Sequence, residues 1–361
     1  MDSLDFDQFL NVTRKYYSGD NCQPLQFSLE GEQIVVHYRA DIAKHTLVYD
    51  YQTLIITLGG ALEYARNALA AQGFNNVSVN LDNKLLATID VTKDAPSLCS
   101  LSIGQATFAL PSVPLAVLAN RHTDRRPYVA LTHFDHEAQI QSPLTYVNSR
   151  VKTSLEPALL EFFAWSDSQV WRSRQLGLDI LNAVDFSSDE PECGLPKKNL
   201  GVGAAELLPI KLIQRFPGLF NVFAAIGAQK GMQKSQLALW KSAQSCLIFT
   251  VPKNASVADK LFASVEMMHT ILQLSAQGYS MQPSTLSTEI LNLPVKQDQA
   301  NLSAAAGIDF AADMERINSV RQALDIGADT QILWLLRLGK TDTAFPDDAK
   351  TGRRNITSLK A

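Results

Sequence analysis

Residues 121–128 read Arg-His-Thr-Asp-Arg-Arg-Pro-Tyr, a segment rich in basic side chains. Arg121, His122, Arg125 and Arg126 can carry a positive charge, and the hydroxyl of Thr123 lies between them. Arginine binds a phosphate through a planar fork of donors, and a hydroxyl adds one more hydrogen bond. The segment is therefore a candidate phosphate-binding site.

A second segment, residues 18–24, combines small and polar residues in the order Ser-Gly-Asp-Asn-Cys-Gln-Pro. The short side chains of Ser18 and Asn21 suit hydrogen bonding to a ligand, and Gly19 lets the backbone approach one closely. On its own, such a segment is also typical of an ordinary turn. Its combination with the basic segment further along the chain makes it a candidate binding loop.

Length and composition narrow the class of protein. The 361 residues exceed the usual size of one domain and predict two domains or one duplicated unit. The formal charge of −4 and the pI near 5.9 argue against a nucleic-acid-binding protein. Residues 1–10 do not resemble a signal peptide, and the most apolar windows, 102–120 and 216–228, fall short of a membrane span. Four separated cysteines without a Cys-x-x-Cys pair are expected to be free thiols, so a soluble cytoplasmic protein is predicted.

Hydrophobic periodicity and turn signals predict helices and strands in both parts of the chain. Residues 92–114 carry three prolines and are the best candidate for a connector. The basic segment is expected on the helix that opens the second half. The expected helices are 5–17, 54–72, 155–183 and 258–277, and the expected strands are 26–28, 33–38, 84–91, 245–251 and 331–338.

Two short stretches repeat with a constant offset of 205 residues: residues 69–74 read Leu-Ala-Ala-Gln-Gly-Phe, and residues 274–279 read Leu-Ser-Ala-Gln-Gly-Tyr. Each closes a long predicted helix, and each contains a glycine typical of a helix C-terminus. A match of this length can arise by chance. Its position after equivalent elements nevertheless favours an internal duplication.

The two polar segments resemble the FMN-binding signatures of the nitroreductase superfamily, Arg-x-Ser/Thr-x-Arg/Lys and Ser-Gly-x-Asn-x-Gln-Pro. In ordinary members the arginine element comes first, and each FMN lies at a homodimer interface to which both subunits contribute. Here the order is inverted, which resembles the long, single-chain, Acg-type branch in which two halves are fused. The resemblance implies an α+β fold of two nitroreductase-like halves, 1–115 and 116–361, each a sheet flanked by helices. It also implies a monomeric pseudo-dimer with one FMN between its halves.

The resemblance also implies roles toward FMN. Arg121 and Thr123 would bind the phosphate with Arg353 or Arg354, because the tail resembles the family's terminal Arg-Arg element; a solvated tail is the alternative. Arg125 would lie by the flavin pyrimidine and stabilise the reduced flavin. The remaining assignments are backbone contacts from His122, flavin-ring contacts from Ser18, Gly19 and Asn21, loop shaping by Gln23 and Pro24, and a backbone N–H near N5 from Gln282, Pro283 or Ser284.

By this resemblance the chain would be an FMN-dependent oxidoreductase that takes hydride from NAD(P)H and reduces a nitroaromatic, quinone or similar acceptor. No catalytic acid or base is expected because the flavin carries the hydride, and no metal site because His133 and His136 lack further ligands. The alternative is an FMN store, since the Gly- and Pro-rich segment 187–235 could close over the flavin as a lid. A third possibility is an α+β domain whose site is degenerate and empty.

Overall fold

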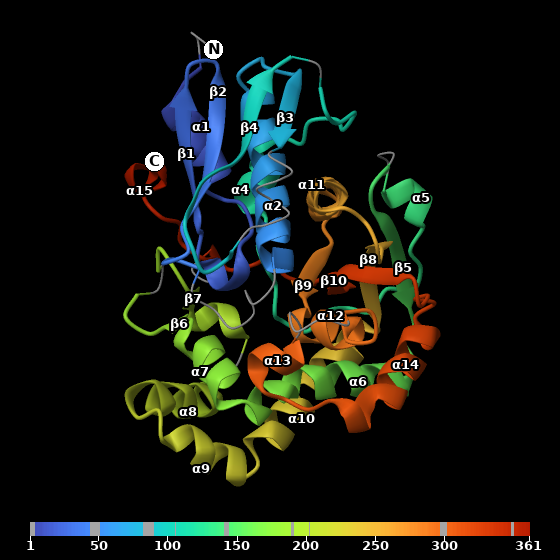
Figure 1. The fold of residues 1–361 in the computed structure, drawn as a ribbon. Helices are drawn as coiled ribbons and strands as arrows, with labels where there is room; N and C mark the ends of the chain where they lie inside the picture. The colour runs from blue at the N-terminus through green and yellow to red at the C-terminus, as the bar shows by residue number, and fades with distance from the viewer. Residues whose placement is uncertain are drawn as a thin grey trace.

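A computed structural model describes residues 4–43, 51–81, 90–104, 106–140, 144–188, 191–201, 203–296, 302–347 and 350–361. The described residues form two four-stranded antiparallel sheets, with helices between them and below the second sheet (Figure 1). No helix among the described residues has both the length and the apolar character that a membrane crossing requires.

The first sheet lies near the N-terminus and has the strand order β1-β2-β4-β3. Its inner face packs against a long helix, α2, through Phe27, Ile34 and Val36, which are all fully buried. The short helix α1 packs on the same long helix. The elements are α1 (Phe6–Thr13), β1 (Leu25–Glu30), β2 (Gln33–Tyr38), α2 (Tyr51–Ala70), β3 (Val77–Leu81) and β4 (Ala95–Ile103).

The second sheet has the order β5-β8-β10-β9 and is buried on both faces. Alternate residues of β8 explain this: Leu247 and Phe249 join the core that contains α11, whereas Cys246 and Ile248 join a second core under α6 and α12. The elements are β5 (Asn148–Thr153), β8 (Ser245–Pro252), α11 (Val257–Ala276), β9 (Ser280–Pro283), α12 (Thr285–Asn292) and β10 (Thr330–Gly339).

Most of the remaining helices form the lower part of the molecule in Figure 1, whereas α4 and α15 lie beside the first sheet and α5 lies near β5. Among them, α10 packs along α6, and α7, α8 and α9 pack on one another. They comprise α4 (Leu115–Asn120), α5 (His136–Gln139), α6 (Pro157–Ser168), α7 (Arg174–Asn182), α8 (Ala204–Arg215), α9 (Leu219–Ala225), α10 (Ala228–Ala243), α13 (Leu302–Ala306), α14 (Met314–Ala323) and α15 (Ile356–Leu359). The strands β6 (Val184–Asp185) and β7 (Leu195–Pro196) form a small parallel pair, and four 3₁₀ turns complete the list: η1 (Gly19–Asn21), η3 (Gln169–Arg172), η4 (Lys197–Leu200) and η5 (Ala311–Asp313).

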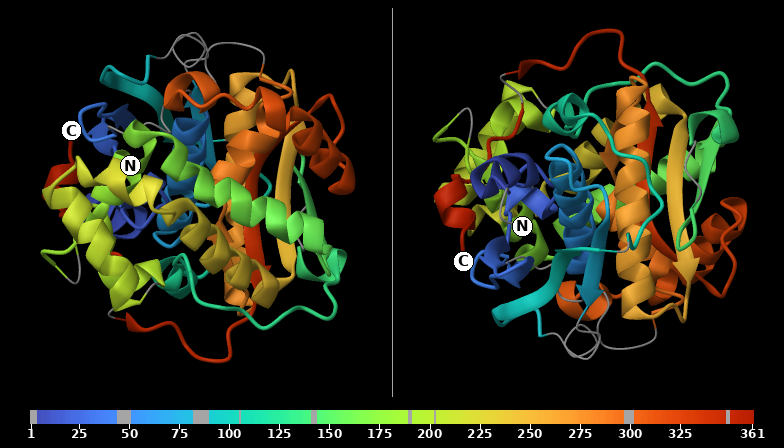
Figure 2. Two further views of the ribbon diagram at one scale, coloured as in Figure 1. Left: turned by 90° about the horizontal axis from the view of Figure 1, so that it is seen from below. Right: turned by 90° about the horizontal axis from the view of Figure 1, so that it is seen from above.

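The two sheets share one topology. In each, the first strand pairs with the second, the second with the fourth and the fourth with the third, and a 20-residue helix joins the second strand to the third. These two helices, α2 and α11, lie side by side between the sheets (Figure 2). They touch at Gly59, where an added Cβ would lie only 2.3 Å from the Cβ of Ser264.

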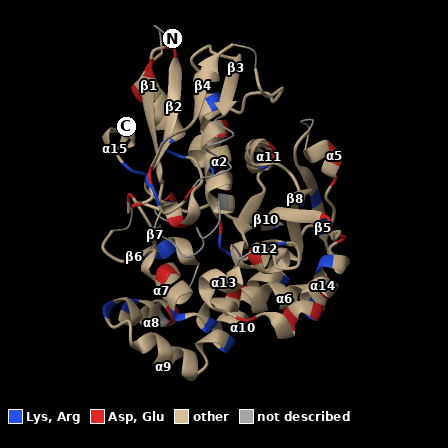
Figure 3. Ribbon diagram, viewed as in Figure 1, with Lys and Arg blue, Asp and Glu red and all other residues tan. Residues whose placement is uncertain are grey.

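Two segments cross between the sheets. Residues 121–129 leave α4 beneath the first sheet and reach the second, where Val129 bridges Lys340. The C-terminal tail runs the opposite way: Lys360 bridges Phe27 of β1, and the Ala361 amide donates to the Phe27 carbonyl at 3.1 Å. Figure 3 shows the tail carrying basic residues where it passes below β1. Residues from both ends of the chain therefore meet between the two sheets.

Several sequence predictions are confirmed at the level of elements: the 33–38 strand, the hairpin with β1, the long helices α2 and α11, and the strands β8 and β10. The predicted connector 92–114 is wrong, because β4 occupies Ala95–Ile103 as an inner strand of the first sheet. Pro96 is the second residue of this strand and lies where the β2–β4 register shifts, and the other two prolines follow the strand. The basic segment is not helical, since α4 ends at Asn120 and the Asp124 carboxylate instead accepts from the Arg126 amide. Most of the predicted strand 84–91 lies outside the described residues.

Candidate functional site

The loop of residues 18–24 follows α1 and holds an unusual backbone conformation. Asp20, Asn21 and Gln23 have φ values of 46°, 57° and 53°, a left-handed region that side chains with a Cβ rarely adopt. Such strain persists only where surrounding contacts fix it, and it is common at binding sites. Here the Gln23 amide donates to Ser18 Oγ at 3.0 Å, which closes the loop on itself.

The C-terminal tail clamps this loop from outside. The Arg354 amide donates to Gln23 Oε1 at 3.1 Å, and Arg354 Nε donates to the Cys22 carbonyl at 3.2 Å. Asn21 Nδ2 donates to the carbonyls of Gly352 and Gly194, at 3.1 and 3.2 Å. The loop is therefore held by residues that lie more than 170 positions further along the chain.

A cavity of about 100 Å³ lies between this loop, the basic segment and the tail. It collects the predicted residues Arg121, Thr123 and Arg125 with Arg353, although the tail is remote in sequence. The other predicted residues along its wall are Ser18, Asn21 and Pro283. The two sequence motifs thus converge on one cavity.

The cations of this cavity are short of anionic partners. Arg353 donates through Nη1 to Asn21 Oδ1 and Thr351 Oγ1, both at 2.6 Å, whereas its Nε is buried without a hydrogen-bond partner. Arg121 Nε donates to the Tyr64 hydroxyl at 3.0 Å. Among the described residues, neither guanidinium makes an ion pair with a carboxylate. Burial, and then repulsion from Arg121, lower the pKa of Arg353 to about 10. An anion here would relieve that repulsion.

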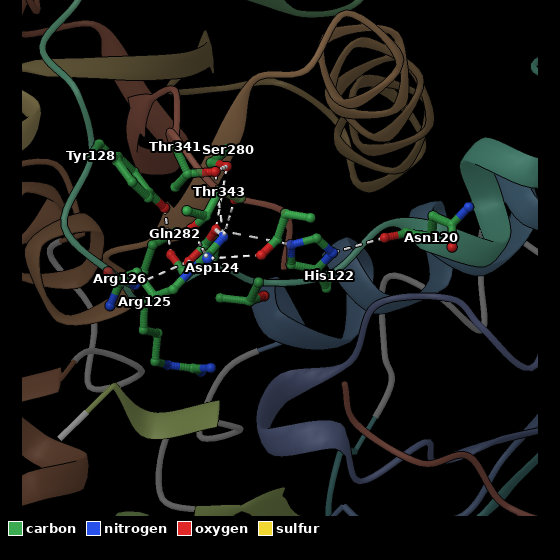
Figure 4. Close-up of polar contacts among 12 residues, drawn as sticks. Asn120, His122, Asp124, Arg125, Arg126, Tyr128, Ser280, Gln282, Thr341 and Thr343 are labelled. Atoms are coloured by element: carbon green, nitrogen blue, oxygen red, sulfur yellow. Dashed lines mark hydrogen bonds and ion pairs between the residues drawn. The ribbon is translucent and has the colours of Figure 1, made fainter. Parts of the chain in front are cut away.

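Arg125 extends into the same cavity from the opposite direction. Its Nη1 donates to Asn199 Oδ1, and burial lowers its pKa despite the nearby Asp20 carboxylate. The adjacent Arg126 behaves differently, because it folds onto Asp124 with contacts of 2.7 and 3.0 Å (Figure 4). Its hydrogen bonds outweigh the burial of Asp124 and lower the pKa of that carboxyl. Arg126 is therefore paired with a carboxylate of the chain, whereas Arg125 lines the cavity.

Other predicted residues lie near the cavity with their side chains engaged elsewhere. Gln282 Oε1 accepts two hydrogen bonds from Arg337, at 2.7 and 3.1 Å. Ser284 Oγ donates to Asp167 at 3.1 Å, and its amide donates to the Leu335 carbonyl at 2.9 Å. Pro283 has no N–H. Neither Pro283 nor Ser284 therefore has a free backbone N–H of the kind that was predicted for residues 282–284.

The remaining predicted residues also have defined positions. His122 stacks on Phe345 with ring centroids 3.7 Å apart, and burial lowers its pKa, which favours the neutral ring. Gln23 shapes the strained loop, and Arg354 clamps it rather than lining the cavity. Gly19 lines the neighbouring, larger cavity. Among the described residues, no group of three or more His, Cys, Asp or Glu could hold a metal ion.

That larger cavity has a volume of about 880 Å³ and adjoins the smaller one at Tyr17, Asp20 and Thr285, which line both. Sequence reasoning missed these shared residues. Tyr17 directly precedes the 18–24 segment and Thr285 directly follows the 282–284 segment, so extending each motif by one residue would have included them. Asn199 and Thr351, which also line the smaller cavity, carried no such signal.

No family model and no curated protein matches this chain. Several solved structures do. The FMN- and NADPH-dependent nitroreductase NfnB from Sphigopyxis sp. strain HMH aligns at 15% identity and a TM-score of 0.32, over 67% of this chain and 95% of that one.

Two further solved structures are similar to the same extent. A nitroreductase-like family protein from Bacillus cereus aligns at 12% identity and a TM-score of 0.33, over 70% of this chain and 96% of that one. The FMN-dependent NfnB from Mycobacterium smegmatis, solved with NADPH, aligns at 13% identity and a TM-score of 0.32, over 67% and 94%.

Proposed function

We propose that this chain is an FMN-dependent, nitroreductase-like oxidoreductase that takes hydride from NAD(P)H and reduces a nitroaromatic, quinone or similar acceptor. The observation that carries the proposal is the convergence of Arg121 and Arg353 on one cavity, without a carboxylate partner for either among the described residues. Two adjacent guanidiniums of this kind suit a phosphate dianion.

The residues present fit FMN. Arg121, Arg353 and Thr123 would hold the phosphate, and the unpartnered Nε of Arg353 would gain an acceptor. Ser18 and Asn21 would contact the polar part of the flavin. Arg125 would face the pyrimidine edge, where its charge favours the reduced flavin.

One expected contact needs reassignment. Pro283 lacks an N–H and the Ser284 amide is already bonded to Leu335, so neither is suited to serve the flavin N5 edge. We assign that position to Thr285, the first residue of α12, because it lines both cavities and helix starts present unpaired N–H groups.

The duplication is part of this proposal, and three observations support it. The two sheets share one strand order, and both long helices end alike: the Phe74 amide donates to Leu69, and the Tyr279 amide to Leu274, each at 3.0 Å. The helices also touch where Gly59 meets Ser264, which are separated by the same offset as the repeats. In a two-fold assembly, a residue that touches its own counterpart lies on the axis. We therefore propose a pseudo-dimer of fused halves.

The bound flavin would supply the hydride chemistry, and the chain would bind, orient and shield the reactants. In the overall reaction, a nitro group takes up two electrons and two protons and becomes a nitroso group and one water. NAD(P)H supplies both electrons and one proton as hydride, and solvent supplies the second proton.

The expected lid, residues 187–235, divides into two parts. Cys193, Gly194 and Leu195 line the cavities with Asn199. Among the described residues of α8, α9 and α10, only Gln214 of α8 lines the larger cavity, and these helices otherwise pack on one another and on neighbouring helices. We assign the covering role to residues 191–201. A cavity of about 880 Å³ beyond them is within the range of small-molecule sites, about 300–1,000 Å³, which favours turnover over storage.

The test is the flavin content and its reduction. Purified protein should release one FMN per chain on heating, and NADH or NADPH should bleach it under anaerobic stopped flow. A flavin-free protein that does not take up FMN, or a ratio near two, contradicts the proposal. Reduction by dithionite but by neither nucleotide at millimolar concentration would favour the storage function instead.

A further inference from the structure

The larger cavity differs in charge from the smaller one beside it. The smaller cavity is lined by three arginines, Arg121, Arg125 and Arg353, with Asp20 the single carboxylate among its described lining residues. The described lining of the larger cavity contains four carboxylates and neither lysine nor arginine: Asp20, Asp179, Asp185 and Glu289. The two adjoining spaces therefore favour ligands of opposite charge.

The carboxylates that line the larger cavity differ in their surroundings. Glu289 is neutralised by Lys296 at 3.0 Å, and Asp20 lies within the field of Arg125. Asp185 on β6 lines the same cavity close to Gly194, whose carbonyl accepts a hydrogen bond from Asn21 of the strained loop. Asp185 accepts from the Oγ and amide of Ser187, both at 2.6 Å, and these hydrogen bonds lower its pKa, so it is ionised at neutral pH.

The same cavity also has an aromatic wall. Tyr17 and Trp334 pack with ring centroids 4.6 Å apart and an interplanar angle of 60°, and Tyr38 lines the same space. Aromatic faces attract organic cations, and carboxylates in a partly enclosed cleft add to this attraction. The aromatic and carboxylate walls together suit a flat, positively charged ring.

We propose that the larger cavity binds the electron acceptor and selects flat aromatic acceptors by charge, with cations preferred over neutral molecules and neutral molecules over anions. This inference rests on the proposed function, because a molecule in this cavity would lie beside an FMN whose phosphate is held in the smaller one. Tyr17 and Thr285, shared by both cavities, would mark the boundary between the two ligands.

The test uses three acceptors that share a para-nitrobenzyl or para-nitrophenyl ring: a trimethylammonium cation, a neutral alcohol and a carboxylate anion. The FMN-loaded protein should show kcat/KM at least about tenfold higher for the cation than for the anion, with the alcohol between them. Calorimetric titration of the same three probes into the oxidised protein should give the same order of affinity. Equal values, or a preference for the carboxylate, would overturn the inference.

Two variants separate the wall from the general charge of the protein. Asp185→Asn should lower the ratio of kcat/KM for the cation to kcat/KM for the anion by about threefold or more. Glu315→Gln should leave this ratio unchanged, because Glu315 is an exposed carboxylate on α14 outside both cavities. An unchanged ratio in Asp185→Asn overturns the assignment of that wall. Failure of the proposed function looks different: FMN would not bind, or no probe would be reduced, whereas the calorimetric order would still report on the cavity.

Discussion

The two sides of the α2–α11 helix pair differ sharply, although we propose that they are related by duplication. On the open side, Thr57 of α2 lines the larger cavity and Ile271 of α11 lines a small cavity that adjoins Arg121. The residues at the repeat offset from these are Phe262 and Arg66, and both are packed against protein. The Phe262 ring contacts Phe108 and Tyr146, with centroids 5.3 and 5.1 Å apart.

Arg66 shows what closes that second side. It forms a 2.8 Å ion pair with the fully buried Glu63, and it donates to the carbonyls of Leu110 and Pro111, both at 3.0 Å. Glu63 also contacts His269 at 2.8 Å. All three nitrogens of the Arg66 guanidinium thus donate to the chain itself. The comparison teaches that the same scaffold can have an anion site on one side and none on the other. The difference lies in whether its arginines already pair with carboxylates of the protein.

The largest expected effect comes from the closed side. Arg66→Ala should cost about 3–5 kcal/mol in the free energy of unfolding, because it leaves Glu63 buried without its cation. Urea unfolding measures this loss. The FMN affinity of the folded protein should stay within about twofold of the original, since Arg66 is remote from the cavity lining. A loss of FMN affinity without a loss of stability would contradict the contrast between the two sides.

On the open side, Arg121→Ala should weaken FMN binding by roughly ten- to a hundredfold, or about 1.5–3 kcal/mol, because a charged partner of the phosphate is lost. The unfolding free energy of the flavin-free protein should not fall, since repulsion with Arg353 is relieved. Fluorescence titration of FMN and urea unfolding measure the two quantities. Arg215→Ala, an exposed arginine at the end of α8, is the matched control and should change neither.

The contact between the two sides can be broken directly. Gly59→Ala should destabilise the protein by about 1–3 kcal/mol, because the new Cβ would lie 2.3 Å from the Cβ of Ser264 and 2.8 Å from its carbonyl carbon. Gly231→Ala on α10 is the control: an added Cβ meets nothing within 4 Å, so helix propensity should leave stability equal or slightly higher. Thermal unfolding compares the two. Equal midpoints would mean that the helices can separate at no cost.

The smallest effect is a pH dependence in the half that contains α12. Burial raises the pKa of Asp167 to about 6, although Ser284 and Trp240 donate hydrogen bonds to it. The folded pKa then exceeds the unfolded one, so stability is greatest below about pH 4 and falls as the pH rises to about 6. We expect Asp167→Asn to remove about 1–2 kcal/mol of this decline in urea unfolding. Parallel curves for the two proteins would refute the assignment.

The sequence predicted the elements whose patterns are local. The long helices α2 and α11, with their glycine ends, and the strands β8 and β10 carry periodicity that needs no partner. The strand pattern of β4 was obscured because Pro96 is its second residue and Pro111 follows it, and Pro209 within α8 lowered the helical signal of that segment. Both elements are stabilised by contacts with distant parts of the chain, and a short stretch of sequence does not show such contacts.

The site shows the same division. The motif chemistry singled out Arg121, Thr123 and Asn21, and these residues line one cavity together with Arg353 of the tail. No signal in the sequence could show that Gln282 is taken by Arg337, because the two lie on neighbouring strands that only the folded sheet places opposite. Whether a side chain is available to a ligand depends on its hydrogen-bond partners, and these are known only from the three-dimensional structure.

The clamp of the tail on the strained loop has a consequence for the order of events during synthesis. The Gln23 side chain bonds the backbone of Arg354, and the Asn21 side chain bonds that of Gly352, each 331 positions further along the chain. Until residues 352–354 leave the ribosome, the loop lacks the tail contacts that help to hold its left-handed conformation. Flavin loading would then follow the completion of translation, so that the supply of flavin affects how quickly new chains mature and not how they begin to fold.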